Sequence, residues 1–309
     1  MREFIIWYNK NGKKFLKIAL IFIIVIMITQ LLRWISIKNQ EEKQNNFVTT
    51  GNENKQDFNT IISDENKSTV TGEELSNTQT ELLKSIDKFA EYCNNNNTDE
   101  AYNLLSEECK KEMYPTVDDF IELYYKKIFD GKLKNISVEN WVNNTYKVKF
   151  SDDALSTGIY NSDNNIQDYI SVVKDKDDNY KLNINGYVGQ EELNKETEAF
   201  DLKIKVVEKN QYMDFTTYTY EVKNGSKNVI RLNDIESEAE MYLEDKNSIK
   251  YYAYMNELAE SDLRVMPGET KKVVIKYYCK FSSTRKITST VFPEIQLGGN
   301  EIARLKIEL

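Results

Sequence analysis

The motif Asp175-x-Asp177-x-Asn179 places three oxygen-bearing side chains at the alternating positions that open a calcium-binding loop. Carboxylate and amide oxygens suit Ca²⁺, but a complete loop of the EF-hand type also needs Gly at the sixth position and a bidentate Glu at the twelfth. This chain has Tyr180 and Gly186 at those two positions. The motif therefore predicts a hairpin turn between two strands and no metal site.

The chain of 309 residues contains no His. This absence excludes Ser-His-Asp and Cys-His nucleophilic sites and His-ligated zinc, and it removes the usual general base at neutral pH. The sequence also lacks a glycine-rich phosphate loop and a nucleophile elbow. We therefore predict that the protein is not an enzyme and that it has no catalytic residue, metal or cofactor.

The three cysteines, Cys93, Cys109 and Cys279, show no C-x-x-C spacing. Two interpretations stay open. One is a Cys93–Cys109 disulfide across a helical hairpin. The other, which we favour, is that all three are small buried apolar side chains.

A tyrosine-rich stretch, YYAYMNEL at 251–258, is a candidate interaction surface. Tyrosine is enriched at protein interfaces, so Tyr251, Tyr252 and Tyr254 are the interface residues that we name. Tyrosine also favours strands, and the chain has 20 of them, so a purely structural role is the alternative.

The formal net charge of −9 argues against a nucleic-acid partner. Neutralising phosphates requires clustered Lys and Arg, whereas here the Lys residues alternate with Asp and Glu. The scarcity of Pro and the abundance of Asn, Lys and Ile indicate an AT-rich genome, as in Gram-positive bacteria of low GC content.

The first element that the sequence predicts is a hydrophobic run, IALIFIIVIMITQLL, between Lys17 and Arg33. With its flanks it reaches the roughly 20 residues that a bilayer requires. A cleaved signal peptide is the main alternative, but no A-x-A-like site follows the run. We therefore expect an uncleaved membrane anchor in contact with the lipid bilayer. Its anchor residues are Ile18, Leu20, Ile24, Ile28, Leu32 and, at the interface, Trp34.

The excess of Lys and Arg before this run predicts a cytoplasmic N-terminus, with the rest of the chain outside the cell membrane. Residues 1–14 are then a cytoplasmic tail, 15–37 a transmembrane helix and 38–76 a linker. The linker is rich in Asn, Gln, Glu, Ser and Thr and has no apolar period, which predicts disorder.

Residues 77–195 change from helical to strand periodicity. Apolar residues at helical spacing predict three helices, starting near Thr78, after Thr98 and at the capping box Thr116-x-x-Asp119. Strands with a period of two follow around 136–138, 146–150, 166–172 and 180–184. Helices followed by a strand meander predict an α+β layer, with the helices on one side of a curved antiparallel sheet.

The segment TDEAYNLLSEECKKEMYPTVDDFIELYYKKIF with its following meander resembles the nuclear-transport-factor-two-like (cystatin-like) α+β cone. The resemblance implies a pocket between helices and sheet, where an Asp–Tyr pair could move a proton, as in ketosteroid isomerase. The residues that would line it are Tyr124, Tyr125, Trp141, Tyr146 and Tyr169. The alternative is that these aromatic side chains fill the interior.

Residues 196–309 alternate as short strands from Phe200 onward, with a turn signal at Asn224-Gly225. The stretch PGETKKVVIKY resembles immunoglobulin-like modules of Gram-positive envelope proteins. The predicted fold class is thus an α+β cone-like domain plus an all-β immunoglobulin-like sandwich, with one N-terminal transmembrane helix.

The sequence favours a non-enzymatic, membrane-anchored, extracytoplasmic scaffold that binds proteins in a bacterial envelope complex. Its sharpest form is an accessory protein of a conjugation or secretion channel. The alternatives are a small-ligand sensor and an isomerase-like enzyme, both using the cavity of the cone.

Overall fold

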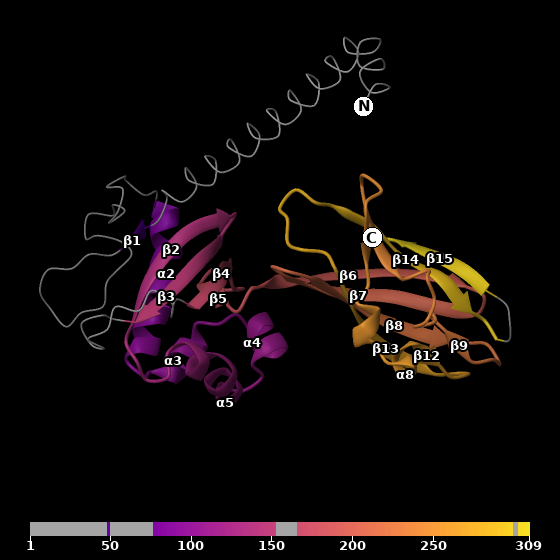
Figure 1. Cartoon of the computed structure of the whole chain (residues 1–309), viewed down its shortest axis with the longest axis horizontal. Helices are drawn as coiled ribbons and strands as arrows, with labels where there is room; N and C mark the ends of the chain where they lie inside the picture. The colour runs from indigo at the N-terminus through magenta and orange to yellow at the C-terminus, as the bar shows by residue number, and fades with distance from the viewer. Residues whose placement is uncertain (1–47, 50–76, 153–165, 299–301) are drawn as a thin grey trace, which may run out of the picture. The chain divides into compact units, whose positions relative to one another are not determined.

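The computed structural model describes residues 48–49, 77–152, 166–298 and 302–309, all of which lie within one compact unit starting at Val48. The predicted tail at 1–14 and membrane span at 15–37 lie outside the described residues. Of the predicted linker, only Val48–Thr49 is described. It forms the short strand β1. Figure 1 shows the helices of residues 77–128 against the first sheet.

The first sheet is antiparallel and follows chain order, β1-β2-β3-β4-β5. Its other strands are β2 (Lys134–Val142), β3 (Thr145–Asp152), β4 (Ile166–Lys174) and β5 (Tyr180–Asn183). The predicted alternation is confirmed, because the residues that face the helices are buried: Ile136, Val138, Tyr146, Val148, Phe150, Ile170, Val172 and Leu182.

The segment 174–179 is the hairpin turn between β4 and β5, as predicted. The Asp175 carboxylate accepts the backbone N–H groups of Asp177 and Asn179, both at 2.9 Å. The oxygen-rich motif therefore closes a turn with its own backbone.

The first predicted helix is confirmed as α2 (Asn77–Asn94), which contacts β2, β4 and β5. Its buried face is the predicted stripe: Leu82, Leu83, Ile86, Phe89, Ala90 and Cys93. The side-chain amide of Asn94 ends the helix against the sheet. It donates to the carbonyl oxygen of Lys134 at 2.9 Å and accepts that residue's N–H at 2.8 Å.

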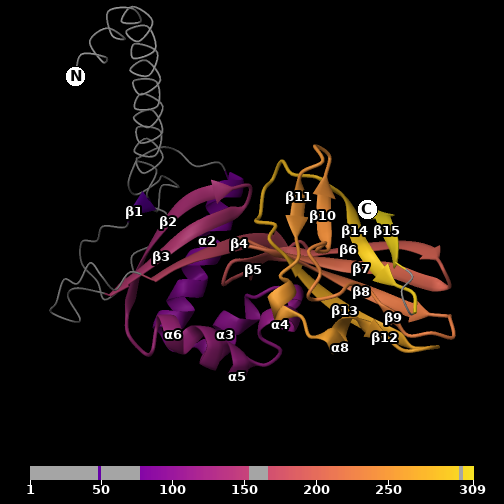
Figure 2. The ribbon, with the colours of Figure 1, turned by 45° about the vertical axis from the view of Figure 1, so that its right-hand side comes forward.

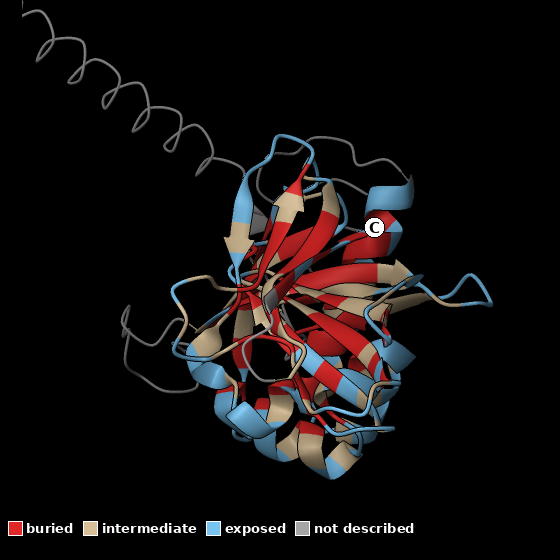
Figure 3. Ribbon diagram, turned by 90° about the vertical axis from the view of Figure 1, so that its right-hand side faces the viewer, coloured by how far each residue is buried: buried red, intermediate tan, exposed pale blue. Residues whose placement is uncertain are grey.

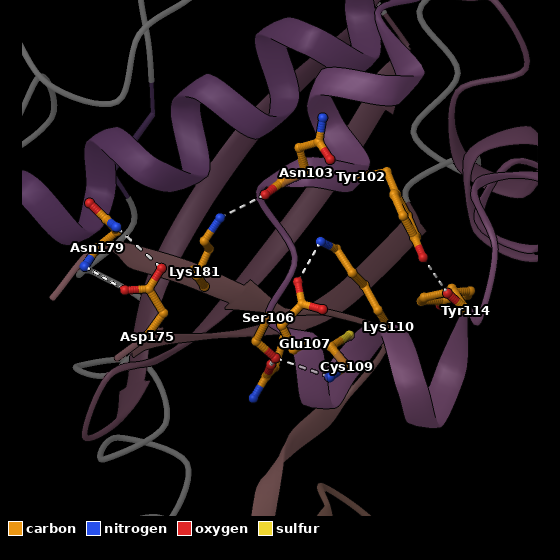
Figure 4. Close-up of polar contacts among 11 residues, drawn as sticks. Tyr102, Asn103, Ser106, Glu107, Cys109, Lys110, Tyr114, Asp175, Asn179 and Lys181 are labelled. Carbon is orange, nitrogen blue, oxygen red and sulfur yellow. Dashed lines mark hydrogen bonds and ion pairs between the residues drawn. The ribbon is translucent and has the colours of Figure 1, made fainter. Parts of the chain in front are cut away.

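The second predicted helix is broken into α3 (Thr98–Asn103) and α4 (Glu107–Met113). Between them, the chain runs beside β5. The N–H of Leu182 donates to the carbonyl oxygen of Leu104, and the N–H of Ser106 donates to that of Leu182. The Ser106 hydroxyl then caps α4 by accepting the N–H of Cys109 at 3.0 Å (Figure 4). Bonding to the sheet edge thus replaces helical bonding at this point.

The third predicted helix starts with the expected capping box, in which Thr116 and Asp119 exchange hydrogen bonds. It continues as α5 (Val117–Phe120), the π-helical turn η1 (Ile121–Tyr125) and α6 (Lys126–Ile128). The wider π turn brings the consecutive side chains Tyr124 and Tyr125 into buried positions.

The second sheet has the order β13-β8-β7-β6, and all its strands are antiparallel. They are β6 (Tyr187–Ala199), β7 (Leu202–Tyr212), β8 (Thr216–Asn224) and β13 (Thr270–Tyr277). The predicted alternation along β13 is confirmed. Val273, Ile275 and Tyr277 are buried, whereas Val274 and Tyr278 are exposed.

The third sheet has the order β11-β10-β14-β9-β12, with β15 also paired to β14. Its strands are β9 (Ile230–Arg231), β10 (Tyr242–Asp245), β11 (Lys250–Tyr252), β12 (Arg264–Val265), β14 (Ile287–Gln296) and β15 (Ile302–Glu308). The short helices η3 (Met255–Glu257) and α8 (Glu260–Leu263) precede β12.

Apolar side chains of the second and third sheets share one core, which includes Val206, Tyr220, Ile275, Leu243 and Phe292. Figure 2 shows β10, β14 and β15 alongside β6–β8, and Figure 3 shows the buried residues along the strands and the exposed residues in the loops. A separate core lies between the helices and the first sheet.

Phe200 and Asp201 form the two-residue turn between β6 and β7, although the sequence predicts Phe200 within a strand. Both residues have φ of 57°, a left-handed conformation that usually selects Asn and Gly. The predicted turn at Asn224-Gly225 lies at the end of β8, where a loop toward β9 begins. Gly225 lies so close to the turn that a Cβ atom there would be 3.1 Å from the carbonyl oxygen of Asp201.

The predicted fold class, an α+β cone-like domain plus an immunoglobulin-like sandwich, is wrong for the described residues. They lie mainly in strands of three antiparallel sheets, and the described helices other than α2 are short segments, of which α5, η1 and α6 follow one another over 117–128. The physical reason is that the apolar stripe at 101–113 pairs with β5 at its centre instead of continuing as a helix. The boundary at 195/196 between the predicted domains stays a prediction.

The prediction of a transmembrane protein is also corrected. None of the helices in the described ranges is both long and apolar enough to span a membrane. The 18-residue α2 carries charged residues, including Lys84 and Glu91, opposite its packed face. The six predicted anchor residues, from Ile18 to Trp34, lie outside the described residues. We do not retain the cell-membrane and extracytoplasmic localisation.

The strained turn predicts a stabilising double substitution. Replacing Phe200 by Asn and Asp201 by Gly is expected to raise the free energy of unfolding by about 1 kcal/mol, because these residues tolerate positive φ. Urea denaturation measures the change. As a control, Phe200→Ala removes the same exposed side chain but keeps the strain, and should alter stability by less than about 0.5 kcal/mol. An equal gain in the control would contradict the explanation.

Candidate functional site

Asp168, on the buried face of β4, is the residue whose chemistry departs most from its surroundings. One carboxylate oxygen accepts the N–H groups of Tyr169 at 2.6 Å and Gly186 at 3.1 Å. The other accepts the Tyr124 hydroxyl at 2.7 Å and the N–H of Asn185 at 2.9 Å. A carboxylate offers about four lone-pair positions, and all four have donors here.

Burial raises the pKa of the Asp168 carboxyl from 3.8 to about 6, and the four hydrogen bonds limit that rise. Burial and the neighbouring carboxylate raise the pKa of the Tyr124 hydroxyl well above 10. Near neutral pH, the pair is therefore a carboxylate that accepts a hydrogen bond from a neutral phenol.

Aromatic rings fill the space around this pair. Phe120 stacks on Tyr124 with ring centroids 5.7 Å apart, and Phe89 and Tyr114 each lie about as close to Tyr124, at 6.1 Å. The Tyr114 hydroxyl is buried and has no hydrogen-bond partner within the described part of the chain. An Asp–Tyr pair of the type considered from the sequence thus exists, but it lies in a packed interior.

The five residues named as cavity lining divide into two groups. Tyr124, Tyr125 and Tyr146 are buried in the first core. Trp141 is 49% exposed and contacts Tyr169, with ring centroids 5.6 Å apart and Lys147 above the indole. The structure therefore does not bring the five together around one space.

Sequence reasoning did not name Asp168, although a signal was present. The period-two series Ile166, Ile170 and Val172 has one irregular step, and Asp168 occupies it. A carboxylate at an inward strand position requires partners, because an unpaired buried charge is costly. Its partners include the turn Asn185-Gly186, where both residues have positive φ.

The predicted interface residues lie in a second candidate region. Tyr254 stacks on Tyr278, with ring centroids 3.4 Å apart, and the N–H of Tyr278 donates to the carbonyl oxygen of Tyr252 at 2.9 Å. Lys276 lies above the Tyr254 ring at 4.5 Å. We call Tyr252, Tyr254 and Tyr278 the tyrosine patch. Tyr251 lies apart from it and donates its hydroxyl to Asp245 at 3.1 Å.

The three cysteines are free and buried. The structure therefore contains no Cys93–Cys109 disulfide. Burial raises the pKa of each thiol, to about 12 for Cys109. The favoured interpretation of small buried side chains is confirmed.

A cleft of about 470 Å³ opens at one end of the second sheet, between the starts of β6 and β8 and the chain that leads into β14. Four cationic side chains line it: Lys209, Lys280, Arg285 and Lys286. None of the residues predicted to line a cavity is among its lining residues. This cleft was not predicted, because its residues come from four separate segments.

Comparison with known proteins gives little guidance. No protein-family model matches the chain, and no curated protein does. One similar solved structure is a conserved hypothetical protein from Bacillus anthracis, with 15% sequence identity and a TM-score of 0.26. The match covers 39% of this chain and 95% of that one. These comparisons neither support nor oppose the two resemblances drawn from the sequence.

The raised pKa of Asp168 predicts a pH-dependent stability. A carboxyl with a pKa raised from 3.8 to about 6 in the folded state contributes stability below pH 3.8 that is lost as the pH rises through 6. Asp168→Asn cannot titrate. The difference in unfolding free energy between wild type and variant should therefore fall by about 2 kcal/mol from pH 4 to pH 7.

Urea denaturation at several pH values measures this difference, and Asp175→Asn is the control. Desolvation raises the pKa of Asp175, but hydrogen bonds from Asn179 and Asp177 lower it, and the net result is a pKa below the usual value. Its stabilising contribution is therefore present at neutral pH and lost on acidification, the opposite sign. A pH-independent difference for Asp168→Asn would show that this carboxyl titrates normally.

Proposed function

We propose that this chain is a non-enzymatic component of a larger protein assembly and that it binds a protein partner through the tyrosine patch. The observation that carries the proposal is the exposure of this patch. Tyr252 and Tyr278 are 44% and 54% exposed. Large side chains of this kind, gathered at one place, are typical of protein interfaces.

The patch is also held in a defined arrangement. The Tyr254 and Tyr278 rings stack on each other. The hydrogen bond from the Tyr278 N–H to the Tyr252 carbonyl oxygen holds the backbone of Tyr252 beside them. Lys276 lies between the Tyr254 and Phe215 rings and pairs with Glu257 at 3.0 Å. A rigid aromatic surface loses little conformational entropy on binding, which favours its use as an anchor.

The buried Asp168–Tyr124 pair supports the non-enzymatic part of the proposal. A general base must reach the proton that it abstracts, within hydrogen-bond distance. Each oxygen of Asp168 already has two donors, and three of the four donors are backbone N–H groups. The pair thus joins η1, β4 and the turn at 185–186 and leaves no free lone pair for a substrate.

Site-specific photocrosslinking tests the proposed surface. A benzoyl-phenylalanine residue in place of Tyr278, in the full chain and in its native cell, is expected to crosslink one protein that mass spectrometry identifies. The same group in place of Phe200, which is 55% exposed at the β6–β7 turn, is the matched control. Equal crosslinking at both positions, or none at Tyr278, would exclude the patch.

Tyr278→Ser then tests the energetic contribution of the ring. We expect the affinity for the identified partner to fall at least about tenfold, because aromatic anchors dominate interface energies. The unfolding free energy should change much less than the binding energy, since the ring is half exposed. Unchanged affinity would overturn the proposal.

A further inference from the structure

The cleft at the end of the second sheet has the size and composition of a small-molecule site. Its volume of about 470 Å³ lies within the range usual for such sites. Its apolar wall includes Val188, Leu193, Phe281 and Ile287, each partly exposed. It is formed by strand ends of the second sheet together with residues 279–287 and Leu309, and none of its lining residues belongs to the Asp168–Tyr124 pair.

The charge of the cleft is opposite to that of the protein. The chain carries a net charge of −9, yet four cationic side chains line this cleft. Glu191, the acidic side chain in the lining, pairs with Lys209 at 2.6 Å, so Lys280, Arg285 and Lys286 have no acidic partner among the lining residues. Like charges that gather in a concave surface attract an anion.

Arg285 is the cation whose position is fixed. Its guanidinium carbon lies 4.5 Å from the centre of the Tyr251 ring, and the Tyr251 hydroxyl is held by Asp245. The guanidinium donates to the carbonyl oxygen of Lys280 and faces the Cys279 sulfur at 3.6 Å. A guanidinium fixed in this way retains N–H donors in a plane that matches a carboxylate.

Lys280 and Lys286 differ from Arg285 in being exposed. Lys280 has a distant partner, Asp214, at 3.7 Å, and both side chains are largely in solvent. Such a pair contributes little stability, so its rearrangement around a ligand costs little. The two lysines can therefore adjust to an anion that Arg285 positions.

We propose that this cleft binds a small organic carboxylate with an apolar body. The carboxylate pairs with Arg285, assisted by the two lysines, and the apolar part lies against Phe281, Ile287 and Leu193. This inference concerns a different surface from the tyrosine patch and does not depend on it. A ligand of this class would bring its charge to the cations and remove part of the apolar wall from water.

Isothermal titration calorimetry of the full chain tests the proposal with 4-phenylbutanoate as the probe. We expect binding, with the neutral 4-phenylbutanamide at least about tenfold weaker because it cannot form the charged pair. Inorganic phosphate, which has no apolar body, should also bind at least about tenfold more weakly. Absence of binding by the probe, or equal affinity for the amide or for phosphate, would overturn the proposal.

Variants locate the site. Arg285→Gln should weaken probe binding about tenfold, whereas Arg264→Gln, the same change at an exposed residue outside the lining, should not alter it. Because Arg285 also packs on Tyr251, Lys286→Gln is the second variant. It should weaken binding about threefold without loss of stability, since Lys286 is exposed. Equal effects of Arg264→Gln and Arg285→Gln would place binding elsewhere.

Discussion

The β6–β7 hairpin belongs to two hydrophobic cores, and much of the described structure depends on this sharing. Near its open end, Tyr187 and Tyr212 are buried in the core beneath the helices. Toward its turn, Leu202, Ile204 and Val206 are buried between the second and third sheets. Because side chains alternate along a strand, a shift of one residue in the pairing would expose both sets at once. Helix α4 is bonded to the hairpin as well, because its Glu112 carboxylate accepts hydrogen bonds from the side chains of Tyr212 and Asn210 on β7.

Polar groups inside the first core connect segments, whereas Lys280 and Lys286 at the cleft remain open to solvent. The two carboxylate oxygens of Asp168 accept hydrogen bonds from η1, from its own strand β4 and from the turn at 185–186, where the chain leaves the first sheet for the second. Such a fully bonded carboxylate defines a conformation. At the cleft, Lys280 and Lys286 have no comparable role. The two regions show that the same residue types serve architecture or recognition according to how many of their bonding positions are occupied.

Local patterns predicted local structure well. The stripe of α2, the Thr116–Asp119 capping box, the turn at 174–179 and the alternation along β13 could all be read from the sequence, because each depends on neighbouring residues. The break at Leu104–Ser106 could not, since its cause is bonding to Leu182, far along the chain. The turn at Phe200-Asp201 was hidden because Phe is not a usual residue at a position of positive φ and because Phe200 continues the apolar alternation with Leu202 and Ile204.

The sites were less predictable than the elements. Asp168 is recognisable in retrospect by an acid in an apolar series, but its four donors come from three segments. The cleft combines β6, the β7–β8 region and residues 279–287, and no local pattern connects them. The fold class failed for a related reason: helical spacing in a short segment does not reveal how few turns will form when a sheet edge competes for the backbone.

The burial of all three native thiols has a practical consequence for studying this protein. Each sulfhydryl is shielded from solvent and held in its protonated, unreactive form. Maleimide reagents should therefore attack a cysteine newly introduced on the surface far faster than any of the native ones. Fluorophores or spin labels can be attached singly to the wild-type background, with no need to remove the cysteines that help fill the two cores.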